Sequence, residues 1–314
     1  MRLDNLLHLI GGELKNSPAI KSFQGFSADL EHLKKGDLYF ARDRTTIDQA
    51  IKGGAYGIVY EGWSQISDEE IPWIKVANLH EALLRLSRFY LIKNRALIYA
   101  LDPLTFDLAH TLIDHPKASF IKEDLFEILG MLEDVEFLFL HPDLAQKLSL
   151  DIAPLPKAQI EPVQEYLFEY SFVYDGRFFE RARISPLFAK ELELVLGIIK
   201  ECSFYFDPQR LHHFSHFHPI FVDTHFRPKE FGKSERALII EPDPALLERE
   251  RRFLESKAPW AKKLYIAKKR LEGFEPFEEI REILYNLPFH YALIGAENFQ
   301  IDLLKPLEQE FTLF

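Results

Sequence analysis

Short apolar runs alternate with amphipathic stretches along the first third of the chain. Three of these runs have the length and the flanking turn residues of strands, at 38–41, 57–60 and 73–76. Residues 45–52 predict a helix that ends at Gly53. Strands that alternate with helices indicate a parallel or mixed sheet with helices packed against it.

A longer helix is predicted after Asn78. Glu81 follows this asparagine at the spacing of a capping box. The apolar side chains of the run fall on one helical face: Leu79, Ala82, Leu83, Leu86, Phe89 and Tyr90. This face is expected to pack against the sheet.

The same alternation continues to the end of the chain. Further strands are predicted at 96–101, 136–140, 237–240, 264–267 and 291–294, and further helices at 105–113, 186–201 and 276–284. Asp243 and Pro244 have the residue types of a helix cap and a first helical residue, so they predict one more helix.

Two segments in the middle of the chain carry turn signals. The proline-rich stretch 154–162 predicts a boundary or a long loop. The pair Asp175-Gly176 lies between the strand-like runs 166–174 and 177–184. It predicts a β-hairpin, because both central positions of such a turn need positive φ.

Charge and cysteine content narrow the classes of function. The chain has 314 residues, enough for two or three domains, and a net charge of −11. Because phosphate backbones require a basic face, nucleic acid is not an expected partner. Cys202 is the single cysteine, which fits a reducing cytoplasm. No apolar run has the length of a signal peptide or a membrane span, so a cytoplasmic protein is expected.

The first third of the sequence also carries a set of family motifs. These segments read LIGGEL at 9–14, FSADLE at 26–31, LKKGDLYFA at 33–41 and QAIKGGA at 49–55. In residue type and spacing they resemble the N-terminal domain of the Mur ligases. Within that family the resemblance is to the ligases that add D-alanyl-D-alanine to the UDP-muramoyl tripeptide.

The resemblance implies an α/β fold with three regions. Residues 1–92 correspond to the N-terminal domain, 93–215 to a shortened central α/β domain, and 216–314 to a C-terminal Rossmann-like domain. The segment 219–228 resembles a shortened form of the motif that begins the C-terminal domain, and 292–295 resembles one of its strands.

In the Mur ligases the N-terminal domain binds the UDP part of the substrate. The resemblance places the corresponding site at Ser27, Asp29 and Asp37. The family's serine and arginine positions are Leu30 and Glu31 here. Leucine cannot donate a hydrogen bond to a phosphate, and glutamate repels one, so the site is expected to be degraded.

The family's ATP site is a glycine-rich loop that ends in Gly-Lys-Thr and cradles phosphates. The strand predicted at 96–101 instead runs into DPLTFD at 102–107, which has no glycine and no lysine. Pro103 also lacks the amide hydrogen that a phosphate cradle uses. ATP binding by this loop and ATP-dependent ligase activity are therefore not expected.

A histidine-rich stretch offers a different chemistry. A helix would place His212 and His216 on one face, and a strand would do the same for Asp223 and His225. Two histidine pairs with a carboxylate are ordinary ligands of zinc or iron, and metal hydrolases use such ligands. The alternative is that the rings pack against neighbouring phenylalanines in a turn between domains.

The leading hypothesis is a pseudoenzyme of the Mur ligase type, with a binding or scaffolding role in peptidoglycan precursor synthesis. Its expected partner is a UDP-muramoyl peptide or a cell-wall synthesis protein, and no cofactor is required. One alternative is a metal-dependent hydrolase built on the residues from His212 to His225. Another is a protein–protein interaction module, suggested by the aromatic content. The apolar segment 311–314 would either dock on its own domain or bind a partner.

Overall fold

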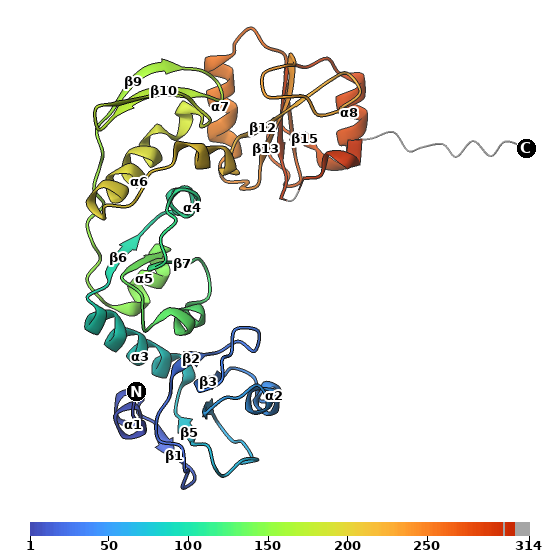
Figure 1. Cartoon of the computed structure of the whole chain (residues 1–314). Coiled ribbons are helices and arrows are strands. Elements are labelled where there is room, and N and C mark those ends of the chain that lie inside the picture. Colours follow the sequence, from blue (N-terminus) through green and yellow to red (C-terminus); the bar gives the residue numbers. More distant parts are fainter. Residues whose placement is uncertain (298, 305–314) are drawn as a thin grey trace, which may run out of the picture. The chain divides into compact units, whose positions relative to one another are not determined.

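Two units, each with its own sheets, make up the chain (Figure 1). The computed structural model describes residues 1–297 and 299–304, so the segment 311–314 lies outside the described residues. Unit 1 is Met1–Pro156 with Glu201–Tyr205, and unit 2 is Lys157–Lys200 with the chain from Phe206 onwards. Within the described ranges, no helix has the length and apolar character needed to cross a membrane.

The first sheet of unit 1 has five strands in the order β1-β5-β4-β3-β2. The elements of this part are α1 Leu3–Ile10, β1 Glu13–Leu14, β2 Gly25–Ser27, β3 Asp37–Ala41, η1 Arg44–Thr46, α2 Ile47–Lys52, β4 Gly57–Glu61, β5 Trp73–Val76 and α3 Leu79–Asn94. Strands β2 to β5 run parallel, and β1 pairs antiparallel with β5. The three predicted strands are confirmed, and the sheet is mixed, one of the two arrangements that the sequence predicted.

Helices cover both faces of this sheet because its central strands are apolar on both sides. Strand β3 is buried at every position. Tyr39 and Ala41 belong to the core that includes α2, whereas Leu38 and Phe40 belong to the core that includes α1 and α3. Successive side chains of a strand point to opposite faces, which explains this division.

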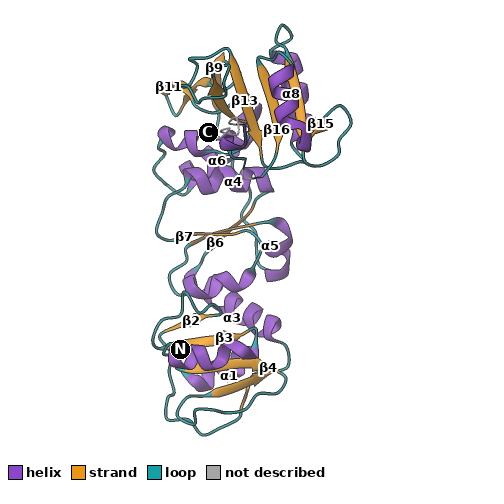
Figure 2. Ribbon diagram, turned by 90° about the vertical axis from the view of Figure 1, so that its right-hand side faces the viewer, coloured by secondary structure: helices purple, strands orange, loops and turns teal. Residues whose placement is uncertain are grey.

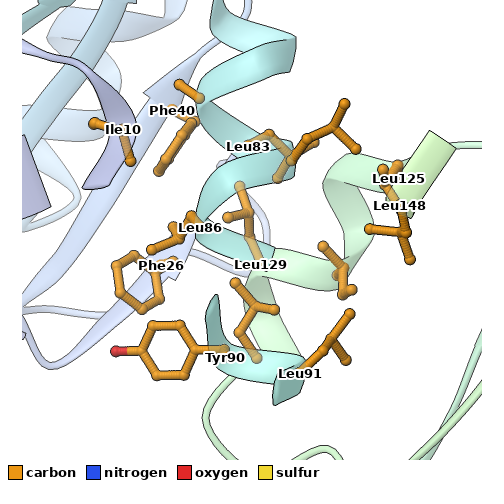
Figure 3. Close-up of a cluster of buried hydrophobic side chains, with 14 of the residues drawn as sticks. Ile10, Phe26, Phe40, Leu83, Leu86, Tyr90, Leu91, Leu125, Leu129 and Leu148 are labelled. Carbon is orange, nitrogen blue, oxygen red and sulfur yellow. The ribbon is translucent and has the colours of Figure 1, made fainter. Parts of the chain in front are cut away.

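Helix α3 begins as predicted, with Asn78 as its N-cap. The side chain of Asn78 accepts a hydrogen bond from the Glu81 amide at 2.8 Å. The predicted apolar face is buried except at Phe89, which is 42% exposed and therefore contradicts the prediction at that position. Figure 3 shows α3 between the strands that carry Phe26 and Phe40 and the later elements of the unit.

Those later elements form a second sheet, a parallel one in the order β6-β8-β7. They are β6 Leu97–Ala100, α4 Pro103–Leu112, β7 Ala118–Ile121, η2 Leu125–Met131, β8 Phe137–Leu140 and α5 Pro142–Leu148. Leu129 and Leu148 share one core with Leu83 and Leu86 of α3 (Figure 3). The boundary predicted at residue 92 therefore falls inside unit 1, and the boundary at 215 falls inside unit 2. The three-region order itself stays a prediction.

Unit 2 begins with an antiparallel sheet in the order β11-β10-β9. Its elements are β9 Ile160–Glu165, β10 Tyr170–Tyr174 and β11 Arg177–Ala182, followed by η3 Pro186–Phe188 and α6 Ala189–Glu201. The predicted hairpin turn is confirmed, with φ of 51° at Asp175 and 72° at Gly176. Strand β9 was not predicted, because its residues lie partly in the proline-rich stretch.

The second sheet of unit 2 has the order β12-β13-β16-β14-β15. The remaining elements are η4 Pro208–His213, β12 His218–Val222, β13 Arg236–Glu241, α7 Leu247–Lys257, β14 Lys263–Ala267, β15 Glu275–Pro276, η5 Phe277–Glu279, α8 Ile280–Asn286, β16 Tyr291–Gly295 and η6 Ile301–Leu304. The four neighbouring strands β13, β16, β14 and β15 are parallel, and β12 is antiparallel to β13. Helix α8 lies against the sheet (Figure 2).

One predicted helix start in this sheet's connections is wrong. Asp243 caps a turn by accepting a hydrogen bond from the Ala245 amide at 2.8 Å. Helix α7 begins at Leu247, after that turn. The cap residue type was recognised correctly, but its hydrogen bond closes a turn that precedes the helix.

Candidate functional site

Ser27 and Asp29, two residues of the predicted UDP-type site, hold the loop that leaves β2. The buried Ser27 hydroxyl donates to the Asp29 carbonyl at 2.8 Å and accepts from the Asp29 amide at 3.2 Å. The Asp29 carboxylate accepts from the Glu31 amide at 3.0 Å and pairs with His32 at 2.8 Å. These contacts, the Glu31 amide first, lower the pKa of Asp29.

Asp37 lies at the other end of the paired strands β2 and β3. In the parallel pairing Asp37 is opposite Gly25, whereas Ser27 is opposite Tyr39. The buried Asp37 carboxylate accepts from the Lys34 amide at 2.9 Å and so closes the turn before β3. The structure therefore brings Ser27 and Asp29 together but places Asp37 away from them.

Two arginines that sequence reasoning missed follow β3 directly. Arg42 pairs with Asp124, and its guanidinium lies 4.7 Å from the centre of the Phe126 ring. Arg44 lies over Gly62 at the end of β4, where a side chain in place of the glycine hydrogen would meet the guanidinium. Among the described residues no carboxylate pairs with Arg44. Both groups stand at the carboxyl edge of the parallel sheet, where ligands of open α/β sheets bind.

The resemblance places the phosphate loop of the Mur ligases at the turn between β6 and α4. Asp102 is the N-cap of α4 and Pro103 is its first residue. The Asp102 carboxylate accepts from the Thr105 amide at 3.2 Å and from the Thr105 hydroxyl at 2.6 Å. A protein carboxylate thus lies at the positive end of the helix, the position that a bound anion takes in phosphate loops.

The histidine-rich stretch forms neither the helix that would align His212 with His216 nor the strand expected for Asp223 and His225. Element η4 ends at His213, so His212 and His216 do not share a helical face. The His212 and His213 rings lie 3.7 Å apart between centroids and are tilted by 41° to each other. Strand β12 ends at Val222, and the turn that follows contains Asp223 and His225. The predictions on which a metal site depended are wrong at the level of secondary structure.

Asp223 serves the geometry of that turn. Its carboxylate accepts from the His225 amide at 2.9 Å and the Arg227 amide at 3.0 Å, and it pairs with Lys229 at 3.4 Å. The Arg227 amide, with these other donors, holds the pKa of Asp223 far below its ordinary value. Within residues 1–297 and 299–304, no group of three or more histidine, cysteine, aspartate or glutamate side chains is arranged to hold a metal ion.

His216 belongs instead to a buried cluster with two glutamates. Its Nδ1 lies 2.8 Å from the Glu241 carboxylate, which also accepts from the amides of Phe217 at 3.1 Å and Asp243 at 2.6 Å. Glu250 is fully buried beside Glu241, and this burial and the second carboxylate raise its pKa well above the ordinary value. The sequence contains only a weak indication of this cluster, namely that an acid, Glu241, directly follows the apolar residues of β13.

A cavity of about 350 Å³ opens beside this cluster within unit 2. Its polar wall carries basic and imidazole groups from η4, β12 and the loops that follow β11, η4 and β12: Arg183, His212, His216, His218 and Lys229. Its apolar wall carries five phenylalanine rings: Phe168, Phe214, Phe217, Phe221 and Phe231. The packing of His216 against Phe214, at 5.1 Å between centroids, agrees with the alternative in which the histidine rings pack against phenylalanines.

With this geometry established, the fold can be compared with solved structures. The chain has the α/β fold of the Mur ligases, as the sequence predicted. The similarity is in particular to MurF. Two crystal structures of MurF from Acinetobacter baumannii match with TM-scores of 0.54 and 0.56 at 10% identity, over 96% of this chain and 86% and 87% of theirs.

A second species gives the same result. The MurF ligase of Thermotoga maritima, solved in complex with ADP, matches with a TM-score of 0.51 at 13% identity, over 89% of this chain and 96% of that one. The sequence itself matches no protein-family model and no curated protein. At these identities the similarity establishes the fold alone.

Proposed function

We propose that this chain is a non-catalytic relative of the Mur ligases that binds a UDP-muramoyl peptide in peptidoglycan precursor synthesis. The fold of MurF supports the link to that process. The loss of ligase activity is inferred from the turn before α4. Recognition of the substrate is inferred from the carboxyl edge of the first sheet.

The Asp102 cap is the observation that carries the non-catalytic part. A phosphate loop leaves several amides free to bind ATP, but here the Asp102 carboxylate already binds the first turn of α4. A phosphate at the same place would meet this negative charge, and like charges a few ångströms apart repel strongly outside bulk water. Product formation from ATP, UDP-muramoyl tripeptide and D-alanyl-D-alanine by the purified protein would overturn the proposal.

Arg42 and Arg44 carry the binding part. Guanidinium groups bind phosphate oxygens in a bidentate manner, and both follow β3 at the edge where ligands of parallel sheets bind. Arg44 offers positive charge that Leu30 and Glu31 do not, whereas Arg42 shares its charge with Asp124. The diphosphate of a UDP-muramoyl peptide fits such a pair.

A thermal-shift titration with UDP-muramoyl tripeptide tests this, with ATP·Mg and zinc as comparators. A ligand at about 100 times its Kd stabilises the fold by about 2.7 kcal/mol, which shifts Tm by several degrees. We expect a shift with the muramoyl nucleotide alone, reduced at least about tenfold in affinity by Arg44→Gln. The exposed Arg177→Gln is the matched control. A shift with zinc alone would contradict the proposal and favour a metal site at the histidine-rich stretch. No shift with any of the three would favour a protein–protein interaction role.

A further inference from the structure

We propose that the cavity of unit 2 binds a small organic anion with a flat apolar body. The anionic group would lie against Arg183, and the body would lie against the phenylalanine wall. This site is separate from the UDP-type site proposed above, because all its lining residues belong to unit 2. It does not depend on that proposal.

The size and the lining of the cavity define the class of ligand. A volume of about 350 Å³ lies within the range of roughly 300–1,000 Å³ in which small-molecule sites fall. Such sites combine an apolar wall with a few polar groups that fix the orientation of the ligand. Aromatic rings favour a flat partner, which can stack on them or meet their edges.

Arg183 supplies the charge. Its guanidinium lies 4.7 Å from the centre of the Phe231 ring. In the described part of the chain, no carboxylate pairs with Arg183. The neighbouring Arg181 differs, because it is held by Glu169 at 2.6 Å. In a chain with a net charge of −11, an unpaired guanidinium on an aromatic wall favours an anion over a cation.

The back of the cavity is held in a conformation that costs energy. Phe217 lines the cavity and has φ of 49°, in a region that bulky residues rarely adopt. The hydrogen bond from its amide to the buried Glu241 carboxylate, at 3.1 Å, holds it there. His216 is fixed by the same carboxylate at 2.8 Å. Strained backbone that buried polar groups hold in place is characteristic of ligand sites.

A fluorescence titration with 8-anilinonaphthalene-1-sulfonate, an aromatic anion, tests the proposal. The emission should rise on binding to the folded protein. Arg183→Met keeps the apolar stem of the side chain and removes the charge, so it should weaken binding about tenfold or more. Arg236→Met is the matched control, since the Arg236 guanidinium stacks on Phe289 at 5.3 Å and does not line the cavity.

Competition identifies the anionic group. Phenyl phosphate and phenylacetate are added separately, with inorganic phosphate as a third competitor. Displacement by phenyl phosphate alone assigns a phosphate ligand, and displacement by phenylacetate alone assigns a carboxylate. Displacement by neither aromatic anion would overturn the proposal, as would equal losses in Arg183→Met and Arg236→Met. Urea unfolding of each variant verifies that it is folded, and Phe231→Leu provides a second variant of the cavity wall.

Discussion

Glu250 shows how far the surroundings of one residue alter its chemistry. It lies on α7 with its carboxyl group fully buried. Burial is the largest cause of its raised pKa, and the Glu241 and Asp243 carboxylates raise this pKa further. The Arg249 guanidinium lowers it. A neutral Glu250 avoids a second buried negative charge beside Glu241, whose carboxylate holds His216 and Phe217.

The raised pKa of Glu250 predicts a pH-dependent stability. Above the ordinary value of 4.5, the folded state retains a proton that the unfolded state has lost, up to the folded-state pKa. The free energy of unfolding therefore falls as pH rises through this window, by at most about 1.4 kcal/mol per pH unit. Glu250→Gln removes this term, so wild type should lose stability relative to the variant between pH 5 and pH 8.

Urea unfolding at several pH values measures this difference. Glu278→Gln, which removes an exposed carboxylate of the same unit, is the control. A gap between wild type and Glu250→Gln that stays constant with pH would contradict the assignment.

At the residue scale, the sequence was informative about residue types but not about their contacts. It identified Asp29 and Asp223 as acids of interest, yet both serve to hold turns through backbone amides. It did not identify Glu241, whose partners come from residues 216 and 217 and from its own turn. Hydrogen bonds between distant segments depend on the tertiary fold, which no local pattern encodes.

At the scale of elements, apolar runs were reliable, and the Asn78 cap was correct whereas the Asp243 cap was not. The strand at 73–76 and the cap at Asn78 were predicted because a buried parallel strand and an N-cap each leave a local signal. Strand β9 leaves none, since only its first residue is buried and it contains Pro162. Before β12, the spacing of His212 and His216 would suit an α-helix, but spacing alone does not distinguish an α-helix from the short 3-10 turn that forms there.

The cap of α3 gives a prediction at this scale. Asn78→Ala removes the acceptor of the Glu81 amide and should destabilise unit 1 by about 1 kcal/mol. For a unit of this size, Tm should fall by about 2–4 °C. Asn78→Asp retains an acceptor and should remain close to wild type. Equal losses in both variants would show that the cap contributes little.

At the scale of the whole molecule, the chain leaves unit 1 after Pro156 and returns to it for Glu201–Tyr205. The returning segment packs against the second sheet of unit 1. The Cys202 thiol lies 3.3 Å from the Tyr99 hydroxyl, and burial raises its pKa, which argues against a nucleophilic thiol. The Phe204 ring lies 4.7 Å from Phe137. No periodicity in the sequence predicts that the chain returns to unit 1 at this segment.

The return segment predicts that a residue distant in sequence stabilises the β6-β8-β7 sheet. The half-buried Phe204 ring also lies 5.1 Å from the His115 ring, so Phe204→Ala removes contacts with strand β8 and with the loop before β7. The cost should be about 2 kcal/mol, roughly half that of truncating a fully buried phenylalanine. Tyr205→Ala is the matched control, because the adjacent ring is 84% exposed.

Hydrogen exchange should show lower protection at β6, β7 and β8 in Phe204→Ala but not in Tyr205→Ala, while β10 and β13 in unit 2 keep theirs. Loss of protection in both units at once would instead mean that the two unfold as one, and the division at residues 156, 201 and 205 would then have no energetic counterpart.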